Sequence, residues 1–243
     1  MISIDVNRLQ LEPGLRVLDI GCGSGRHTAA IARYKGIQVL GADINPGDLV
    51  ETKKRLIFQE RLEGKRGRWD LLATSINRLP FRDNFFDLIV CSEILEHIPD
   101  HCMAVAEVVR VLKPGRDLVV SVPRFLPERI CWALSREYHN ANNGHIRIYK
   151  KKELIKLLEG SGLKKWSSHY AHSLHSPYWW LKCLLGPTRN DAVVVNLYHD
   201  LLTWDIMKRP WITRFLDDLL NPILGKSLVL YLRKAGSRVT SDE

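Results

Sequence analysis

A glycine-rich turn is the first feature of this sequence that could do chemistry. Residues 16–26 read Arg-Val-Leu-Asp-Ile-Gly-Cys-Gly-Ser-Gly-Arg, an apolar run that stops at alternating glycines. The run favours a strand buried on both faces, and the glycines favour a turn into a helix. Glycine has no Cβ, so the backbone can take positive φ and a ligand can lie directly against it. The stretch therefore predicts a ligand site at the carboxyl end of a strand.

The spacing of the glycines excludes two well-known nucleotide-binding loops. Counting from Gly21, the sixth position is Arg26, whereas the dinucleotide fingerprint requires a glycine there. No Gly-Lys-Ser/Thr follows the turn, so the Walker pattern is also absent. Taken alone, a turn of this kind leaves cofactor binding and simple chain topology equally open.

The stretch from Val17 to Arg26 closely resembles the first motif of class I S-adenosylmethionine-dependent methyltransferases. Residues 79–81 (Leu-Pro-Phe), 86–87 (Phe-Asp) and 110–115 (Arg-Val-Leu-Lys-Pro-Gly) are similar to the type 11 methyltransferases of ubiquinone and menaquinone biosynthesis. The resemblance implies S-adenosyl-L-methionine as cofactor and in-line methyl transfer to a small acceptor, lipid-like or aromatic. It implies an α/β fold: a doubly wound, mainly parallel, seven-stranded Rossmann-like sheet with an antiparallel last strand and helical insertions.

The resemblance and the residues together predict a cofactor site. By resemblance, Gly21 and Gly23 pass beneath the cofactor and Asp19 faces its methionine ammonium directly or through water. Asp43 ends the strand expected at 38–42, where a carboxylate can accept hydrogen bonds from both hydroxyls of a ribose. Ser75 stands where the family has an aspartate that binds adenine, and its hydroxyl can accept that bond without a charge. The full predicted set is Asp19, Gly21, Cys22, Gly23, Gly25, Asp43, Ile44, Ser75, Ile76 and Ser92.

Two histidines are candidates for the acceptor side. His97 follows the strand expected at 85–90 and could act as a general base, because imidazole titrates near neutrality. His145 lies in Gly-His-Ile-Arg-Ile-Tyr, which resembles the family segment Gly-His-x-Arg-x-Phe. For both, a structural role is the alternative, since methyl transfer can depend on alignment more than on a base. No metal site is predicted: the histidines at 169, 172 and 175 have no acid or cysteine nearby in the sequence.

Length and composition limit the organisation and the compartment. With 243 residues and 45% hydrophobic composition, we expect one domain, with its core at about 15–170 and 225–234. The five cysteines are scattered, with no Cys-x-x-Cys pair, and residues 1–15 carry no secretory signal. No apolar run reaches the ~18 residues of a membrane-spanning helix. These features predict a cytoplasmic protein.

Two segments, at about 123–145 and 171–224, are expected to be helical insertions. Prolines 187, 210 and 222 divide the second into helices expected at 176–185, 191–208 and 211–220, all rich in aromatic residues. This apolar insertion predicts a lid, a dimer contact or a peripheral membrane contact through residues 173–221, the last at the inner face of a membrane. The rival hypothesis is a non-catalytic module that binds a membrane or a protein through the insertion. Only the net charge of +9 favours nucleic acid, so no such partner is expected.

Overall fold

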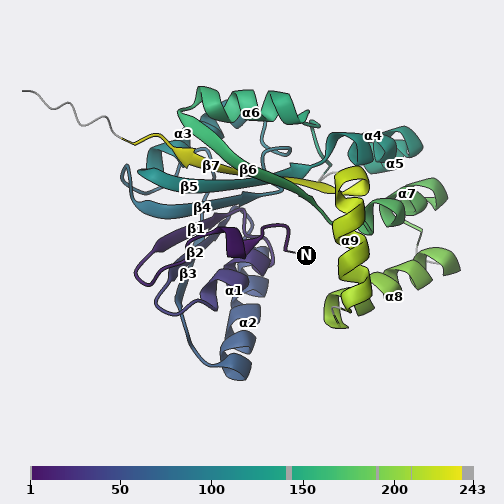
Figure 1. Ribbon diagram of the computed structural model, residues 1–243, viewed down its shortest axis with the longest axis horizontal. Helices are drawn as coiled ribbons and strands as arrows, with labels where there is room; N and C mark the ends of the chain where they lie inside the picture. The colour runs from purple at the N-terminus through teal and green to yellow at the C-terminus, as the bar shows by residue number, and fades with distance from the viewer. Residues whose placement is uncertain (1, 141–143, 190–191, 209, 237–243) are drawn as a thin grey trace, which may run out of the picture.

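A seven-stranded sheet forms the centre of the protein, with helices on both faces (Figure 1). The computed structural model describes residues 2–140, 144–189, 192–208 and 210–236. The strands lie in the order β3-β2-β1-β4-β5-β7-β6, and β7 runs antiparallel to both of its neighbours. This confirms the fold class expected from the sequence. The strands are β1 (Arg16–Ile20), β2 (Gln38–Asp43), β3 (Arg68–Ala73), β4 (Phe86–Ser92), β5 (Leu112–Pro123), β6 (Leu163–Ala171) and β7 (Ser227–Lys234).

The helices fall into two groups. The first flanks the sheet and consists of α1 (Arg26–Ala32), α2 (Pro46–Glu63), α3 (His101–Val111) and α6 (Lys151–Gly160). The second gathers beyond one end of the sheet (Figure 1) and consists of α4 (Phe125–Leu134), α5 (Arg136–His139), α7 (His175–Leu185), α8 (Val193–Lys208) and α9 (Trp211–Leu224). A short 3₁₀ helix, η1 (Val6–Arg8), precedes β1.

The central strands are buried on both faces, as their apolar sequences predict. In β1, Leu18 and Ile20 belong to one apolar layer, while Val17 belongs to the layer on the opposite face. In the adjacent β4, Ile89 and Val90 divide between the same two layers. Alternate side chains of a strand point to opposite faces, so these short apolar runs serve both layers at once. Strands β1, β2 and β4 run parallel to one another, so their carboxyl ends meet at one edge of the sheet.

Two boundaries differ from the sequence expectation. Pro114 and Gly115 predict a break between a helix at 100–112 and a strand at 117–122, whereas strand β5 begins at Leu112 and runs through both residues. Helix α9 continues past Pro222 to Leu224, although it was expected to end at residue 220. Arg124 explains the second case, because its guanidinium donates to the carbonyls of Asn221 at 3.2 Å and Pro222 at 2.8 Å. These bonds satisfy carbonyl groups that the end of a helix leaves free.

Candidate functional site

Three glycines shape the loop between β1 and α1. Gly21, Gly23 and Gly25 have φ of 69°, 50° and 73°, a region that other residues rarely enter. A Cβ on Gly21 would overlap Ile94 and one on Gly25 would overlap Thr52, whereas a Cβ on Gly23 would meet nothing within 4 Å. The loop is therefore packed from behind and open at Gly23, where a ligand can reach the backbone.

Side chains from β2 and α2 hold this loop in place. Asp43 ends β2, and its Oδ2 accepts from the Gly23 amide at 2.8 Å. Its Oδ1 accepts from the Asn45 amide at 2.9 Å. Thr52 of α2 donates to the Gly23 carbonyl at 2.6 Å. Each carboxylate oxygen can accept more than one hydrogen bond, so Asp43 anchors the loop and keeps capacity for the hydroxyls of a ligand.

A cavity of about 330 Å³ opens above the glycine loop. Its other walls are Ser3 of the N-terminal segment, Ser92 and Glu93 at the end of β4, His172 after β6, and Lys226 before β7. Residues 1–15 are too few to form a separate cap over the site, yet Ser3 lies in the cavity wall. The cavity thus joins five separate parts of the chain at the carboxyl edge of the sheet, the usual place for a ligand in this kind of fold.

Asp19 lies behind the glycine loop and is only 1% exposed. Its Oδ2 accepts a hydrogen bond from the Thr28 hydroxyl at 2.5 Å, and its Oδ1 has no hydrogen-bond partner within the described part of the chain. Burial raises the pKa of Asp19 to about 6, although the bonds from Thr28 act in the opposite direction. An unpartnered buried carboxylate oxygen costs free energy. This arrangement fits the nearby binding of a cationic group.

Two of the predicted cofactor residues present their side chains to the edge of the sheet. Ile44 follows Asp43 and is 74% exposed, an unusual position for an isoleucine. Ser92 lines the cavity, and its hydroxyl is 2.7 Å from that of Ser121. Ile44 can therefore cover a planar ligand group, while Ser92 borders the reacting end of the cavity.

The side chains of three other predicted residues are engaged elsewhere. Cys22 packs its buried thiol 4.0 Å from the hydroxyl of Thr52, so only its backbone faces the cavity region. Ile76 is buried in one of the apolar layers. Ser75 accepts a hydrogen bond from the Asn77 amide at 3.3 Å. A ligand contact at these positions would run through the backbone of Cys22 and Ile76 and a free lone pair of Ser75.

The two candidate histidines come together next to the end of β4. The ring centroids of His97 and His145 are 5.0 Å apart, although 48 positions separate them in sequence. His145 Nδ1 is 2.6 Å from an oxygen of Glu128 on α4, which is 1% exposed. Arg147 donates to the carbonyls of Leu95 at 3.0 Å and Pro99 at 2.8 Å. These bonds bring the segment that carries His145 against the turn that carries His97.

Buried carboxyl groups surround these histidines. We refer to the five residues Glu93, Glu96, His97, Glu128 and His145 as the Glu–His cluster. Burial raises the pKa of Glu96 well above its ordinary value, and the charge of Glu93 raises it further. Burial also acts to raise the pKa of Glu128, but the hydrogen bond to His145 and its charge outweigh it and lower that pKa. Burial, together with the charge of His145, lowers the pKa of His97. A neutral His97 can accept a proton near neutral pH.

Glu93 connects the Glu–His cluster to the cavity. It lines the cavity, and its Oε1 accepts from the Ser121 hydroxyl at 3.2 Å. Its φ of 56° is unusual for a residue other than glycine. Such backbone strain is often found at functional sites. The cavity and the Glu–His cluster are therefore neighbouring parts of one site.

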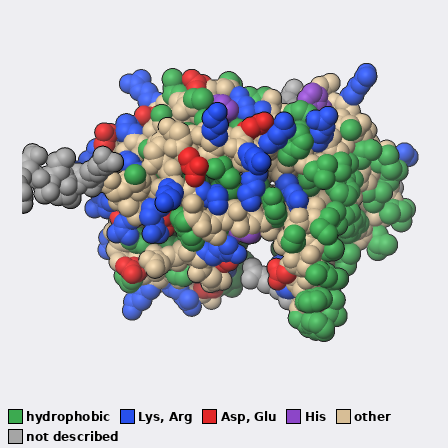
Figure 2. Space-filling view, turned by 45° about the horizontal axis from the view of Figure 1, so that its top comes forward, with side chains coloured by type: hydrophobic (Ala, Val, Ile, Leu, Met, Phe, Trp, Pro, Cys, Tyr) green, Lys and Arg blue, Asp and Glu red, His purple; other side chains and the backbone are tan. Residues whose placement is uncertain are grey.

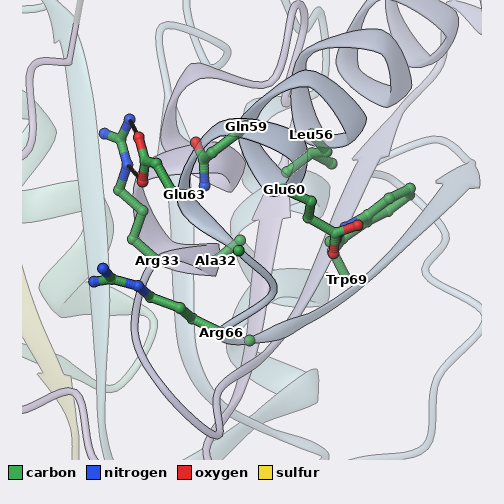
Figure 3. Close-up of a pocket in the computed structure, with 10 residues that line it drawn as sticks. Ala32, Arg33, Leu56, Gln59, Glu60, Glu63, Arg66 and Trp69 are labelled. Atoms are coloured by element: carbon green, nitrogen blue, oxygen red, sulfur yellow. Dashed lines mark hydrogen bonds and ion pairs between the residues drawn. The ribbon is translucent and has the colours of Figure 1, made fainter.

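A second depression, between α1, α2 and β3, is structural (Figure 3). It encloses only about 10 Å³, little more than the space needed by one water molecule. Arg33 and Glu63 form an ion pair across it at 2.7 Å, and Trp69 donates to Glu60 at 2.8 Å (Figure 3). These contacts tie the helices to the strand and leave no room for a substrate.

The predicted set of site residues did not include Glu96, Glu128 or Lys226. Glu96 follows Glu93 by three positions and precedes His97, a spacing that places acids and imidazole around one turn. That spacing was a usable signal. Glu128 and Lys226 have no such signal, because they lie far along the chain and only folding brings them to the site. Of the histidines at 169, 172 and 175, His169 is bonded to the Ser3 carbonyl at 3.1 Å, whereas the ring centroids of His172 and His175 lie 5.6 Å apart.

Comparison with known proteins identifies the family. A family model described as a methyltransferase domain matches residues 3–168. Cycloartenol-C-24-methyltransferase 1 of Oryza sativa subsp. japonica is 31% identical over 156 residues, which cover 64% of this chain and 40% of that protein. Ubiquinone biosynthesis O-methyltransferase of Hahella chejuensis is 33% identical over 141 residues, covering 54% of this chain and 56% of that protein. The chain thus spans less than two thirds of either relative.

A solved structure shares the fold across nearly the whole chain. The [4+2]-cyclase SpnF superposes with a TM-score of 0.61 at 21% identity, covering 95% of this chain and 79% of that one. At this identity the likeness concerns the fold alone. Neither the family match nor the relatives support the non-catalytic alternative. The extent of the family match shows that the chain belongs to the methyltransferase domain family and is a class I, S-adenosylmethionine-dependent methyltransferase by descent.

Proposed function

We propose that this protein transfers a methyl group from S-adenosyl-L-methionine to a small, lipid-like or aromatic acceptor. The observation that carries the proposal is the glycine loop, which is packed from behind and open only at Gly23, beneath a cavity of about 330 Å³. The relatives named above are a cycloartenol methyltransferase and a methyltransferase of ubiquinone biosynthesis, which supports a hydrophobic acceptor. When bound, the cofactor supplies an electrophilic methyl group on a sulfonium.

The residues of the glycine loop region would hold the cofactor. The backbone at Gly21 and Gly23 would lie beneath it, and Asp43 would accept from its ribose hydroxyls while still bonding the Gly23 amide. Ile44 would cover the adenine. Asp19 is buried behind the loop and only 1% exposed, so we expect it to act on the methionine ammonium through water, which would give its Oδ1 a hydrogen bond.

The Glu–His cluster would bind and orient the acceptor. His97 and His145 lie beside Glu93, which borders the cavity, so an acceptor between them would have its reacting atom near the methyl group. His97 would take the proton of a hydroxyl acceptor. Correct alignment alone can contribute ~7–11 kcal/mol. The burial of the Glu–His cluster would also keep water away from the reacting atoms.

The two helical insertions would act as a lid. Trp180 of α7 donates to the Pro127 carbonyl of α4 at 3.0 Å, and the Tyr138 and Trp179 rings are 5.8 Å apart. The insertions therefore contact each other at the end of the sheet that carries the site (Figure 1). Such a lid would exclude water and favour an apolar acceptor.

Calorimetric titration with S-adenosylmethionine and S-adenosylhomocysteine tests the cofactor assignment. We expect micromolar binding of both, no binding of NAD, and loss of binding in Asp43→Ala. Asp70→Ala is the matched control, because Asp70 is exposed on β3 away from the loop. A folded protein that binds neither ligand would overturn the proposal. Retained affinity in Asp43→Ala would overturn the role of that carboxylate. With the cofactor bound, radiolabelled methyl transfer to quinone and sterol precursors identifies the acceptor class.

A peripheral membrane contact through α8 and α9 is the second part of the proposal. Trp211, Phe215 and Leu219 follow one another at intervals of four along α9, so they share one face. They are 77%, 61% and 60% exposed, and no residue of α9 is buried. Figure 2 shows this apolar surface covering one end of the molecule. Neighbouring α8 adds Val193, Val194, Leu197, Leu201, Trp204, Ile206 and Met207.

An anionic bilayer surface is the occupant that fits this face. The formal charge of the chain is +9, which attracts an acidic surface, and the exposed aromatic rings suit the depth of the lipid headgroups. A lipid-like acceptor would be reached at such a surface. Among the described residues, no helix is long and apolar enough to cross a membrane, so the contact we propose is peripheral.

Sedimentation with vesicles of mixed zwitterionic and anionic phospholipid tests the membrane contact. We expect the wild type to pellet with the vesicles and a Trp211→Glu/Phe215→Glu double variant to stay in solution. The control is Phe58→Glu/Leu62→Glu on α2, whose side chains are similarly exposed, at 64% and 70%. Equal pelleting of both double variants would overturn the assignment. The assignment would also be overturned if the wild type did not bind vesicles but formed a dimer, and if Trp211→Glu/Phe215→Glu were monomeric while the control variant remained dimeric.

A further inference from the structure

An unpartnered carboxyl group lies within the Glu–His cluster. Glu96 is 0% exposed, and neither of its carboxyl oxygens has a hydrogen-bond partner among the described residues. Leaving such a group unpaired in the interior is costly. Lys226 brings positive charge to the neighbourhood, but its ammonium lies 4.6 Å from the centre of the Trp179 ring and does not bond Glu96. Among the described residues, no cationic side chain is therefore bonded to this carboxyl group.

Two imidazole rings face the same space as this carboxyl group. One ligand atom each from Glu96, His97 and His145 can be chosen so that all lie within 4.8 Å of one another. In a tetrahedral site with bonds of about 2.0–2.1 Å, ligand atoms are about 3.4 Å apart. Modest rotation of the side chains would close that difference. The three groups could thus converge on one ion.

The second layer of contacts orients His145 for metal binding. Glu128 occupies Nδ1 of His145 at 2.6 Å, which leaves the lone pair of Nε2 for an ion. A carboxylate that bonds the far nitrogen of a ligating histidine is a regular feature of metal sites. The bond to Glu128 fixes the tautomer and the direction of the His145 ring.

We propose that Glu96, His97 and His145 bind one divalent cation of the kind that accepts imidazole as well as carboxylate ligands, such as Zn²⁺ or Mn²⁺. One carboxylate and two imidazoles leave at least one position open. Mg²⁺ fits less well, because it prefers oxygen ligands and retains its water. The sequence predicted no metal site, because the histidines at 169, 172 and 175 have no acid or cysteine nearby along the chain. The proposed ligands lie elsewhere, at positions 96, 97 and 145.

The open position would face the acceptor side of the cavity. Glu93 both lines the cavity and is close enough to Glu96 to raise its pKa, so the ion would lie next to the place where the acceptor binds. A cation there could hold an oxygen of the acceptor and favour its deprotonated form. In this cation-bound form the ion would replace His97 as the group that promotes deprotonation, because the ion would occupy the lone pair of that imidazole. The binding of the cation itself does not depend on methyl transfer and is measured without cofactor.

Titration of the tag-free full chain with Mn²⁺, after chelator treatment, tests the site. The electron paramagnetic resonance signal of free Mn²⁺ reports what remains unbound. We expect one equivalent to bind and Zn²⁺ to displace it. Glu96→Gln and His145→Gln should each weaken binding at least tenfold, and Mn²⁺ should raise the melting temperature of the wild type but not of Glu96→Gln. Mn²⁺ is the first probe because it has little affinity for thiols such as the exposed Cys102.

His139→Gln is the matched control, since His139 is exposed on the neighbouring α5 and outside the cluster. It should bind Mn²⁺ as the wild type does. A folded wild type that binds neither Mn²⁺ nor Zn²⁺, or binding that persists in Glu96→Gln and His145→Gln, would overturn the proposal. Cofactor titrations of the same samples separate the two questions: a chain that binds S-adenosylmethionine without the cation loses only this inference.

Discussion

The sheet and the helical insertion α7–α9 use apolar residues in opposite ways. In the sheet, Val17, Leu18 and Ile89 are all 0% exposed. In the insertion, Tyr178, Val195 and Leu202 are the buried members of a separate apolar cluster, while many large apolar side chains face outward (Figure 2). The sheet is stabilised by its own burial. The insertion leaves apolar side chains exposed to solvent, which is typical of a surface that binds a membrane or a protein partner.

The largest expected difference is in stability. Ile89→Ala should lower the free energy of unfolding by about 2–5 kcal/mol, because it leaves a cavity between two packed layers. Leu219→Ala, at a side chain that is 60% exposed, should change it by less than about 0.5 kcal/mol. Urea unfolding of both variants measures this. A loss of more than about 2 kcal/mol in Leu219→Ala would show that the outward face is covered in the free protein and would break the comparison.

The next effect concerns the opening of the glycine loop. Gly23→Ala should weaken S-adenosylmethionine binding about 100-fold, or about 2.7 kcal/mol, because its methyl group would enter the space left for the cofactor and the residue would keep a φ of 50°. Gly160→Ala is the control, since a Cβ there also meets nothing but lies on α6, away from the site. Calorimetry gives both affinities. Unchanged binding in Gly23→Ala would place the cofactor elsewhere.

The third effect is a pH dependence caused by Asp19. Its pKa is about 6 in the folded protein against an ordinary 3.8, so the folded state binds more protons between these values. Stability should therefore fall as pH rises through that window, by about 3 kcal/mol at most, and stay lower above it. Asp19→Asn should remove this dependence and be the more stable form at pH 8 by about 1–3 kcal/mol.

Urea unfolding of wild type and Asp19→Asn across this pH range provides the test. The variant should gain stability while losing cofactor affinity, the usual trade-off at a functional site. Parallel stability curves for the two proteins would mean that the buried carboxyl group of Asp19 does not titrate in this window.

The smallest expected effect is at Ser75. The family resemblance places an aspartate here, so Ser75→Asp should strengthen S-adenosylmethionine binding by about 1 kcal/mol, because a charged acceptor bonds the adenine amino group more strongly. Ser75→Ala should weaken it slightly. Calorimetric affinities for the two variants should move in opposite directions. A common direction would show that residue 75 does not contact the adenine.

Local sequence determined the sheet and the cofactor loop. The apolar run of β1 and the glycines at 21, 23 and 25 act through local backbone conformation, and Asp43 is marked by its place at the end of an apolar strand. Each of these features can be read from a short run of consecutive residues, although the bond between Asp43 and Gly23 joins positions 20 apart. The predicted helices of the insertion were also found, apart from the end of α9.

Tertiary structure alone decided what faces each histidine. Glu128 reaches His145 across 17 positions, His97 meets His145 across 48, and Lys226 enters the cavity wall from before the last strand. No periodicity or motif links these residues, because the contacts arise from the packing of separate elements at one edge of the sheet. The burial of Glu96 is likewise a property of the assembled core. The sequence therefore determined where a cofactor loop forms, and the packing of distant segments decided the chemistry beside it.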